Sequence, residues 1–186
     1  GPALEGPFVP VASVMQEVGT GLATHLASSE KVMVDLKLDR VIEDCVMHNV
    51  IAKTKGSSKS QVIMFSAHSD SVIAGPGIND NGSGSVALLT IAKELAKYSV
   101  NNAIHFAWWS AEEYSLLGAK HYVTNLNQAG KDQIRLYLNF DMITSPNYIL
   151  SMHDGNGSTF NSTSPAGSAQ AEAMFLITSR ILPRSH

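Results

Sequence analysis

Carboxylates and a histidine recur directly after apolar, strand-like runs of this chain. His68 and Asp70 follow one run, Glu112 and Glu113 follow a second, and Asp141 follows a third. If these runs are neighbouring parallel strands, their carboxyl ends bring the side chains to the edge where open α/β sheets place ligands. Carboxylate oxygens and an imidazole nitrogen together suit divalent metal ions such as zinc. The spacing therefore predicts a metal site.

A glycine-rich loop, Gly77–Gly84, lies between the first two runs and contributes one more acid, Asp80. Its glycines let the backbone fold tightly around an ion, so Asp80 is the candidate for a carboxylate that bridges two metals. Two metals about 3.5–4 Å apart can polarise a carbonyl and activate a water. The loop lacks the Lys-Ser/Thr pair of a P-loop, which argues against phosphate binding.

The other acids have separable expected roles. Asp70 is placed to accept a hydrogen bond from the His68 ring nitrogen that does not bind metal, which would fix the tautomer. Glu112 and Glu113 are adjacent, so one can bind metal while the other faces the substrate water. Asp141 is expected to complete the first metal site. Taken alone, paired glutamates more often begin an exposed helix, and Asp141 could cap a helix or turn.

Composition is that of a globular chain of one-domain size. The sequence has 186 residues, of which 44% are hydrophobic and 16% charged. A net charge of −3 gives no sign of a nucleic-acid-binding face. No apolar run is long enough to span a bilayer. We therefore expect no nucleic-acid partner and no membrane segment, while the oligomeric state stays open.

Two features of the sequence bear on the cellular compartment of the protein, namely its cysteine content and its glycosylation motifs. Cys45 is the sole cysteine, which excludes an intrachain disulfide, and it is expected to be a small buried residue. N-x-S/T motifs occur at Asn81, Asn156 and Asn161. A glycan at Asn81 would block the proposed metal loop, whereas the other two are credible acceptors. Because the start lacks the features of a signal peptide, we expect a removed signal or an internal fragment.

Periodicity predicts strands alternating with helices, which indicates βαβ units and a largely parallel sheet. The expected strands are Val9–Val14, Lys31–Leu38, His48–Thr54, Val62–Ala67, Ala103–Trp109 and Ile134–Phe140. The expected helices are Gln16–Ala27, one opened by Gly82–Gly84 and running to about Tyr98, Leu116–Leu126 and Ala169–Ile181. Ser145–Ser168 is predicted to be a polar loop. The expected fold is α/β, a three-layer helix–sheet–helix arrangement with a mixed, mostly parallel sheet.

Four motifs together resemble the co-catalytic zinc aminopeptidase family, most closely its fungal secreted leucine-type members and aminopeptidase Y. The resemblance covers roughly residues 46–175, in order and with compatible spacing, which argues against a chance match. The motifs are His68-Ser-Asp70, the Gly77–Gly84 loop, Ala111-Glu112-Glu113 with Leu116-Leu117-Gly118, and Asn139-Phe-Asp141-Met142.

This resemblance implies two Zn²⁺ ions and hydrolysis of N-terminal residues from peptides. It implies that His68 and Asp141 bind one zinc, Asp80 bridges, Glu113 binds the other zinc and Glu112 is the general base. Asp70 is counted with Glu112 as catalytic through its contact with His68. A secreted or vacuolar glycoprotein is implied as well. Residues 1–42 resemble the end of a protease-associated domain with its linker, and residues 43–186 a partial catalytic domain.

The family supplies a final histidine ligand beyond the point where this chain ends. Neither His153 nor His186 lies in a matching motif, so we expect a catalytic domain that is incomplete at its C-terminus. Two alternatives stay open. The chain could be a single-zinc enzyme resembling glutaminyl cyclases, or a truncated, inactive metal-binding or interaction fragment. His68 with the full acid set favours two metals and hydrolysis.

Overall fold

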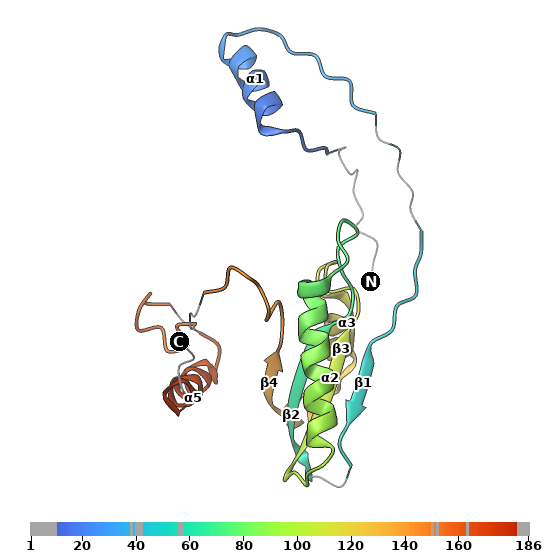
Figure 1. Ribbon diagram of the computed structural model, residues 1–186, viewed down its shortest axis with the longest axis vertical. Helices are drawn as coiled ribbons and strands as arrows, with labels where there is room; N and C mark the ends of the chain where they lie inside the picture. Colours follow the sequence, from blue (N-terminus) through green and yellow to red (C-terminus); the bar gives the residue numbers. More distant parts are fainter. Residues whose placement is uncertain are drawn as a thin grey trace. The chain divides into compact units, whose positions relative to one another are not determined.

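The computed structural model describes residues 11–37, 39, 43–55, 58–149, 151, 153–162 and 164–181. The chain divides into two compact units, Gly1–Asp141 and Met142–His186. The first unit contains a four-stranded sheet in the order β1-β3-β2-β4 (Figure 1). Its strands are β1 (Val50–Lys53), β2 (Ser58–His68), β3 (Asn102–Trp109) and β4 (Ile134–Asn139).

Strand directions confirm the predicted mixed, mostly parallel sheet. β2 pairs in parallel with β3 on one side and with β4 on the other, whereas β1 runs antiparallel to β3. The parallel pairing brings the carboxyl ends of the three longer strands to the same end of the sheet. This shared end is where the sequence places its histidine and acids.

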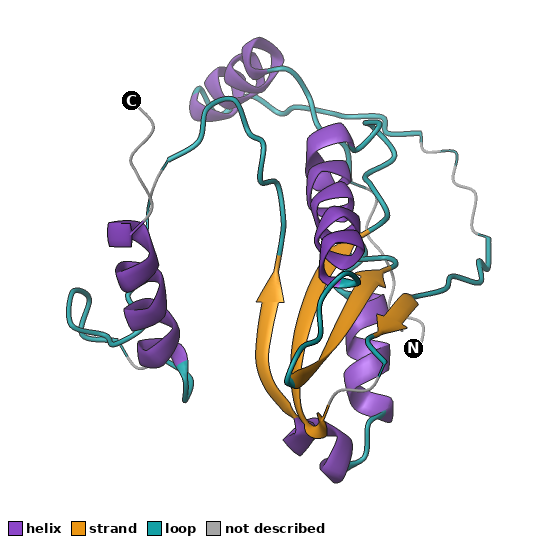
Figure 2. Cartoon of the chain, turned by 60° about the horizontal axis from the view of Figure 1, so that its bottom comes forward, coloured by secondary structure: helices purple, strands orange, loops and turns teal. Residues whose placement is uncertain are grey.

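Helix α2 (Gly84–Leu95) covers one face of the sheet. Its Leu88 is fully buried against Ala67 of β2 and against Ile104 and Phe106 of β3. Removing a side chain of that size from water contributes about 1.5–3 kcal/mol. Figure 2 shows helices on both faces of the sheet, which requires strands that are apolar on both sides.

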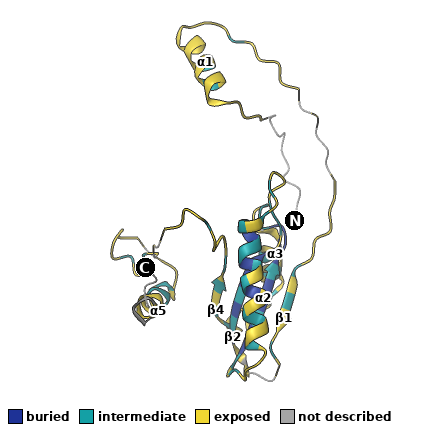
Figure 3. Ribbon diagram, viewed as in Figure 1, coloured by how far each residue is buried: buried dark blue, intermediate teal, exposed yellow. Residues whose placement is uncertain are grey.

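Helix α3 (Leu117–Asn125) covers the opposite face. Met64, Ala107 and Trp109 form the buried cluster there, and Tyr122 of α3 packs against it. Figure 3 shows the buried positions gathered along the central strands. The predicted helix–sheet–helix layering is confirmed, and His105 lies on the same face of β3 as Ala107.

The remaining helices are α1 (Gln16–Ala27), α4 (Gln128–Gln133) and α5 (Ser168–Ile181). The bounds of α1 are those predicted, and α5 begins one residue earlier than predicted. The six-residue α4 was not predicted. It begins after Asn127, whose side chain accepts a hydrogen bond from the Gly130 N–H at 2.8 Å. That bond satisfies one of the donors that a helix N-terminus leaves free.

Several expectations for the N-terminal part are wrong. Residues 31–37 form no strand despite their alternating pattern, and Leu38 lies outside the described residues. Residues 11–14 form no strand either, and residues 9 and 10 of that predicted strand also lie outside. A strand requires a neighbour for its N–H and C=O groups, and none pairs with these segments in the described part. Cys45 is exposed, not buried, because its segment precedes the sheet.

In the second unit, the described residues between Met142 and α5 contain no helix or strand, in agreement with the predicted loop. Asp154 organises part of it, because its Oδ2 accepts hydrogen bonds from the N–H groups of Thr159 and Phe160, each at 2.9 Å. None of the helices in the described part of the chain combines the length and apolar character that crossing a membrane requires.

Candidate metal centre

His68 lies at the centre of the acidic set. It ends β2, its side chain is 2% exposed, and its Nε2 lies 3.0 Å from Oδ1 of Asp80. The same nitrogen lies 3.5 Å from Oδ1 of Asp141 and 4.0 Å from Oε2 of Glu112. The turn with Asp80 and the segments that follow β3 and β4 therefore converge on the imidazole at the end of β2, as the sequence spacing predicts.

Glu113 shows the clearest fit to a metal ion. Ligand atoms of His68, Asp80 and Glu113 all lie within 4.8 Å of one another. Oε1 of Glu113 is buried and has no hydrogen-bond partner among the described residues. A carboxylate oxygen buried in this way is costly unless a cation or a donor compensates it. One imidazole with several carboxylates is a donor set that suits zinc, so these residues fit a metal site.

Asp70 holds the segment that carries the two glutamates. Its Oδ1 accepts a hydrogen bond from the Glu112 N–H at 3.0 Å, and its Oδ2 accepts one from the Glu113 N–H at 3.2 Å. Nδ1 of His68 lies 3.1 Å from the backbone oxygen of Asp70 and 3.5 Å from its Oδ1. The expected partner of the ring was the carboxylate, whereas the backbone oxygen is the nearer acceptor.

The turn η1 (Ile78–Ser83) projects Asp80 between β2 and α2. Gly77 precedes the turn with φ of 66°, and a Cβ there would lie 2.6 Å from Cβ of Ser71 and 2.9 Å from the Asp80 carbonyl oxygen. Glycine is therefore required on both steric and conformational grounds. Asp80 has φ of −105° and ψ of 92°, and it is joined to Asn81 by a cis peptide bond.

Asn81 is a functional candidate that the sequence reasoning missed, since it was considered only as a glycosylation motif. Its side chain is 1% exposed; Oδ1 accepts from the Gly84 N–H at 3.0 Å, and Nδ2 donates to the Phe140 oxygen at 2.9 Å. An asparagine three residues before a helical N–H is a capping signal, which could have identified it. Its amide connects the Asp80 turn to the residue before Asp141.

The acids change the protonation of His68. Burial lowers the pKa of the imidazole, but the carboxylates of Asp141, Glu112, Asp70 and Asp80 raise it more, so that the pKa stands above its ordinary value. Opposite charges within a few ångströms favour the charged form of a histidine. The surrounding field therefore attracts positive charge to this position.

The pKa of Glu112 is raised above its ordinary value. Burial is the main cause, and the negative charges of Asp141, Glu113 and Asp70 add to it, while His68 opposes it. A carboxyl whose pKa moves toward neutrality is better matched to proton transfer at physiological pH. Glu112 is also 30% exposed, so a solvent molecule or a substrate can reach it.

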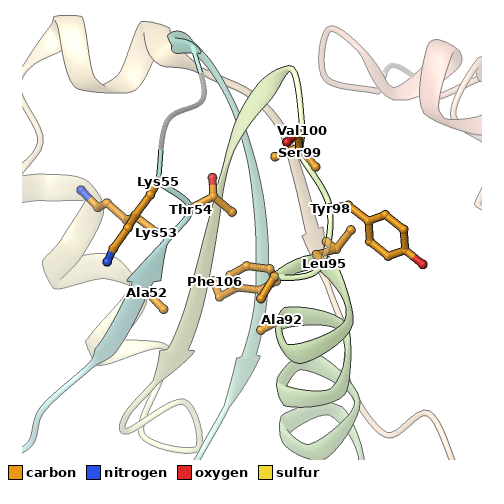
Figure 4. A pocket seen from close by; sticks show the side chains of 11 residues that line it. Ala52, Lys53, Thr54, Lys55, Ala92, Leu95, Tyr98, Ser99, Val100 and Phe106 are labelled. Carbon is orange, nitrogen blue, oxygen red and sulfur yellow. The ribbon is translucent and has the colours of Figure 1, made fainter.

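Two cavities differ in how close they lie to His68 and the acids around it, and they are lined by different residues. One of about 520 Å³ is lined by His68, Asp70 and Trp108, among others. The other, of about 490 Å³, lies between β1 and the end of α2, where Leu95 and Phe106 form its apolar wall (Figure 4). Within the described residues, none of the converging acids lines the second cavity. His68 and Asp70 connect the first cavity to the metal centre, whereas Asp80, Glu112, Glu113 and Asp141 are not among the described residues that line either cavity.

Comparison with known proteins agrees with this geometry. The sequence profile of Peptidase family M28 matches residues 49–180. Leucine aminopeptidase 2 of Trichophyton rubrum is 51% identical over 172 residues, which are 92% of this chain and 34% of that protein. The probable leucine aminopeptidase 2 of Aspergillus oryzae is 50% identical over 171 residues, with the same coverage of 92% and 34%. The chain thus spans about a third of the length of these curated relatives.

A solved structure shares the fold. The aminopeptidase from Aneurinibacillus sp. strain AM-1 superposes with a TM-score of 0.62 and 28% sequence identity. The match covers 70% of this chain and 33% of that one.

Proposed function

This chain belongs to peptidase family M28, and we propose that it supplies the metal-binding part of a zinc aminopeptidase that removes N-terminal residues from peptides. The observation that carries the proposal is the convergence of His68, Asp80 and Glu113 within 4.8 Å, with Glu112 beside them. A structural ion pair would not need so many carboxylates around one imidazole, because like charges repel unless cations lie between them.

We assign two zinc ions to this set. His68 and Asp141 would hold one ion, Glu113 the other, and Asp80 would bridge them. The 3.0 Å approach of Asp80 to His68 and its place in the same ligand group as Glu113 support the bridging role. When bound, zinc acts as a Lewis acid that polarises a carbonyl and makes water more acidic.

Glu112 is the general base of the proposed mechanism. Its carboxylate accepts a proton from the attacking water and returns it to the amine that leaves, a dual role that such bases commonly have. Asp70 keeps the backbone of Glu112 and Glu113 in place through its two hydrogen bonds. The two side chains can then serve different purposes, one binding metal and the other moving protons.

Peptides with a free N-terminus are the proposed substrates, and the name of the relatives makes leucine the first residue to test. We propose a secreted or vacuolar glycoprotein, since Asn156 and Asn161 are exposed. The assignment of residues 1–42 to the end of a protease-associated domain stays a prediction. Of the two C-terminal histidines, His153 is exposed, and His186 lies outside the described residues.

The test is hydrolysis of leucine p-nitroanilide by the purified protein, with chelator and then with added zinc. We expect activity that chelation removes and zinc restores. Glu112→Gln should lower kcat by about 10²–10⁴-fold with unchanged zinc content, because it removes proton transfer and leaves the ligands intact. Glu113→Gln is the matched variant, and it should lose zinc.

Other outcomes distinguish the alternatives. Full activity of Glu112→Gln would remove the general-base assignment. One zinc per chain, with cyclisation of an N-terminal glutamine, would indicate the cyclase-like enzyme. Zinc binding without turnover of any aminoacyl substrate would indicate the inactive fragment.

A further inference from the structure

Asp141 lies two residues beyond the end of β4, a strand with a single described neighbour. β4 pairs with β2 alone, and no other described strand lies on its outer side. The last register pair of this ladder is Ser66 with Asn139. His68 and Asp141 both lie beyond that pair, so the ladder itself does not fix the distance between them.

A chain of side-chain hydrogen bonds closes this end of the ladder. Nε1 of Trp109 donates to the hydroxyl of Tyr137 at 3.1 Å. The Ser66 hydroxyl lies 2.6 Å from the Tyr137 hydroxyl and 2.7 Å from Oδ1 of Asn139. Because an indole only donates, Tyr137 can give its proton to Ser66, and Ser66 can give its own to Asn139. All the bonds then point in one direction, and bonds aligned in this way strengthen one another.

The backbone just before Asp141 is held from two sides. The Phe140 N–H donates to the main-chain carbonyl oxygen of Ser66 at 2.8 Å, and the Phe140 oxygen accepts from Nδ2 of Asn81 at 2.9 Å. Ser66 is 0% exposed and Asn81 is 1% exposed. Burying a hydroxyl and an amide costs free energy that burying apolar side chains would not. Polar residues at these two positions are therefore better explained by the hydrogen bonds that they make than by packing.

We infer that Ser66 and Asn81 are positioning residues that set the place of Asp141 relative to His68. The Ser66 hydroxyl acts through Asn139, whereas Asn81 acts through the Phe140 oxygen and ties the residue before Asp141 to the Asp80 turn. The metal-binding consequence rests on the proposed function, because it takes Asp141 as a zinc ligand. The positioning itself does not depend on a metal.

The first measurement uses metal-free protein and amide hydrogen exchange. Ser66→Ala should speed exchange in residues 139–141, and Asn81→Ala should act in the same direction. Ile104→Val is the control, because it removes a methyl group from the buried cluster under α2, which includes neither Ser66 nor Asn81. It should lower thermal stability without selective loosening of residues 139–141. Unchanged exchange there in Ser66→Ala and Asn81→Ala would overturn the inference.

The second measurement is zinc affinity, from competition with a chromogenic chelator. Ser66→Ala should weaken zinc binding by about 10–100-fold, the usual effect of losing a residue that orients a ligand. In an Asp141→Ala background the same change should have no further effect, since coupled residues are not additive. Equal weakening in both backgrounds would mean general destabilisation and would contradict the inference. Faster exchange with unchanged zinc affinity would keep the positioning role and reject Asp141 as a ligand.

Discussion

Nε2 of His68 lies 3.0 Å from Oδ1 of Asp80, although one residue ends a buried strand and the other projects from a turn. The imidazole is 2% exposed and the carboxylate 42% exposed. The pair therefore has a buried member at the end of β2 and an accessible member on the turn, which can face the proposed metal.

Replacing Asp80 with alanine should remove zinc from both positions, because the proposed bridge contributes to each. Elemental analysis of the purified protein measures the number of ions per chain. Asp132→Ala is a suitable control, since its exposed carboxylate accepts from Nε2 of Gln128 at 2.7 Å, within α4. Two zinc ions retained by Asp80→Ala would contradict the bridging role.

Stability should fall in acid partly because of His105. Nδ1 of this residue is buried and has no hydrogen-bond partner in the described part of the chain. Burial, with the nearby charge of Lys53, lowers the pKa of His105 below its ordinary value of 6.5. Below pH 6.5 the unfolded chain therefore binds a proton that the folded chain does not, and the free energy of unfolding decreases until the pH passes the lowered pKa.

Denaturant unfolding between pH 7.5 and pH 4.5 measures this effect. His105→Gln should show a shallower acid slope than the unmodified protein, since the variant has no ring to protonate. An unchanged slope would mean that His105 keeps its ordinary titration in the folded state.

Gly84→Ala should destabilise the first unit by about 1–3 kcal/mol, as overpacking typically does. The added Cβ would collide with the Phe140 oxygen and with Oδ1 of Asn81, both of which meet at the start of α2. Thermal unfolding measures the loss. Gly21→Ala, in α1, has nothing within 4 Å of the added Cβ and should not lower stability.

Glycan occupancy should differ among the three motifs. After expression in a eukaryotic secretory host, peptide mass spectrometry should find modification at Asn156 and Asn161, which are exposed. Asn81 should be unmodified, because its buried Nδ2 is already hydrogen-bonded to Phe140. A glycan at Asn81 in folded protein would contradict the described turn.

Much of the fold can be predicted from the periodicity of apolar residues, and the predictions that were wrong have physical causes. The runs that became β2, β3 and β4 are apolar and have neighbours, so propensity and tertiary pairing agree. Lys31–Leu38 has the alternation of a strand, but pattern alone cannot supply a partner. Helix α4 is too short for periodicity to reveal, although Asn127 offered a capping signal.

The residues that could bind metal in the candidate site were easier to predict from the sequence than the residues that hold them in position. His68 and the acids could be chosen because metal chemistry restricts the residue types. Ser66 and Asn81 are common polar residues whose importance depends on hydrogen bonds to the end of β4 and the residue after it, about 60–75 residues away in sequence. Such contacts appear only when the chain is folded.

Cys45 has a practical consequence. It is the sole cysteine of the sequence and is exposed. One accessible thiol gives a unique attachment point for a fluorophore or a spin label. Under oxidising conditions the same thiol has no second cysteine to pair with in these 186 residues, so a disulfide between two copies of this chain joins separate molecules. Preparations should therefore be kept reduced, or carry serine at this position, before the number of subunits is measured.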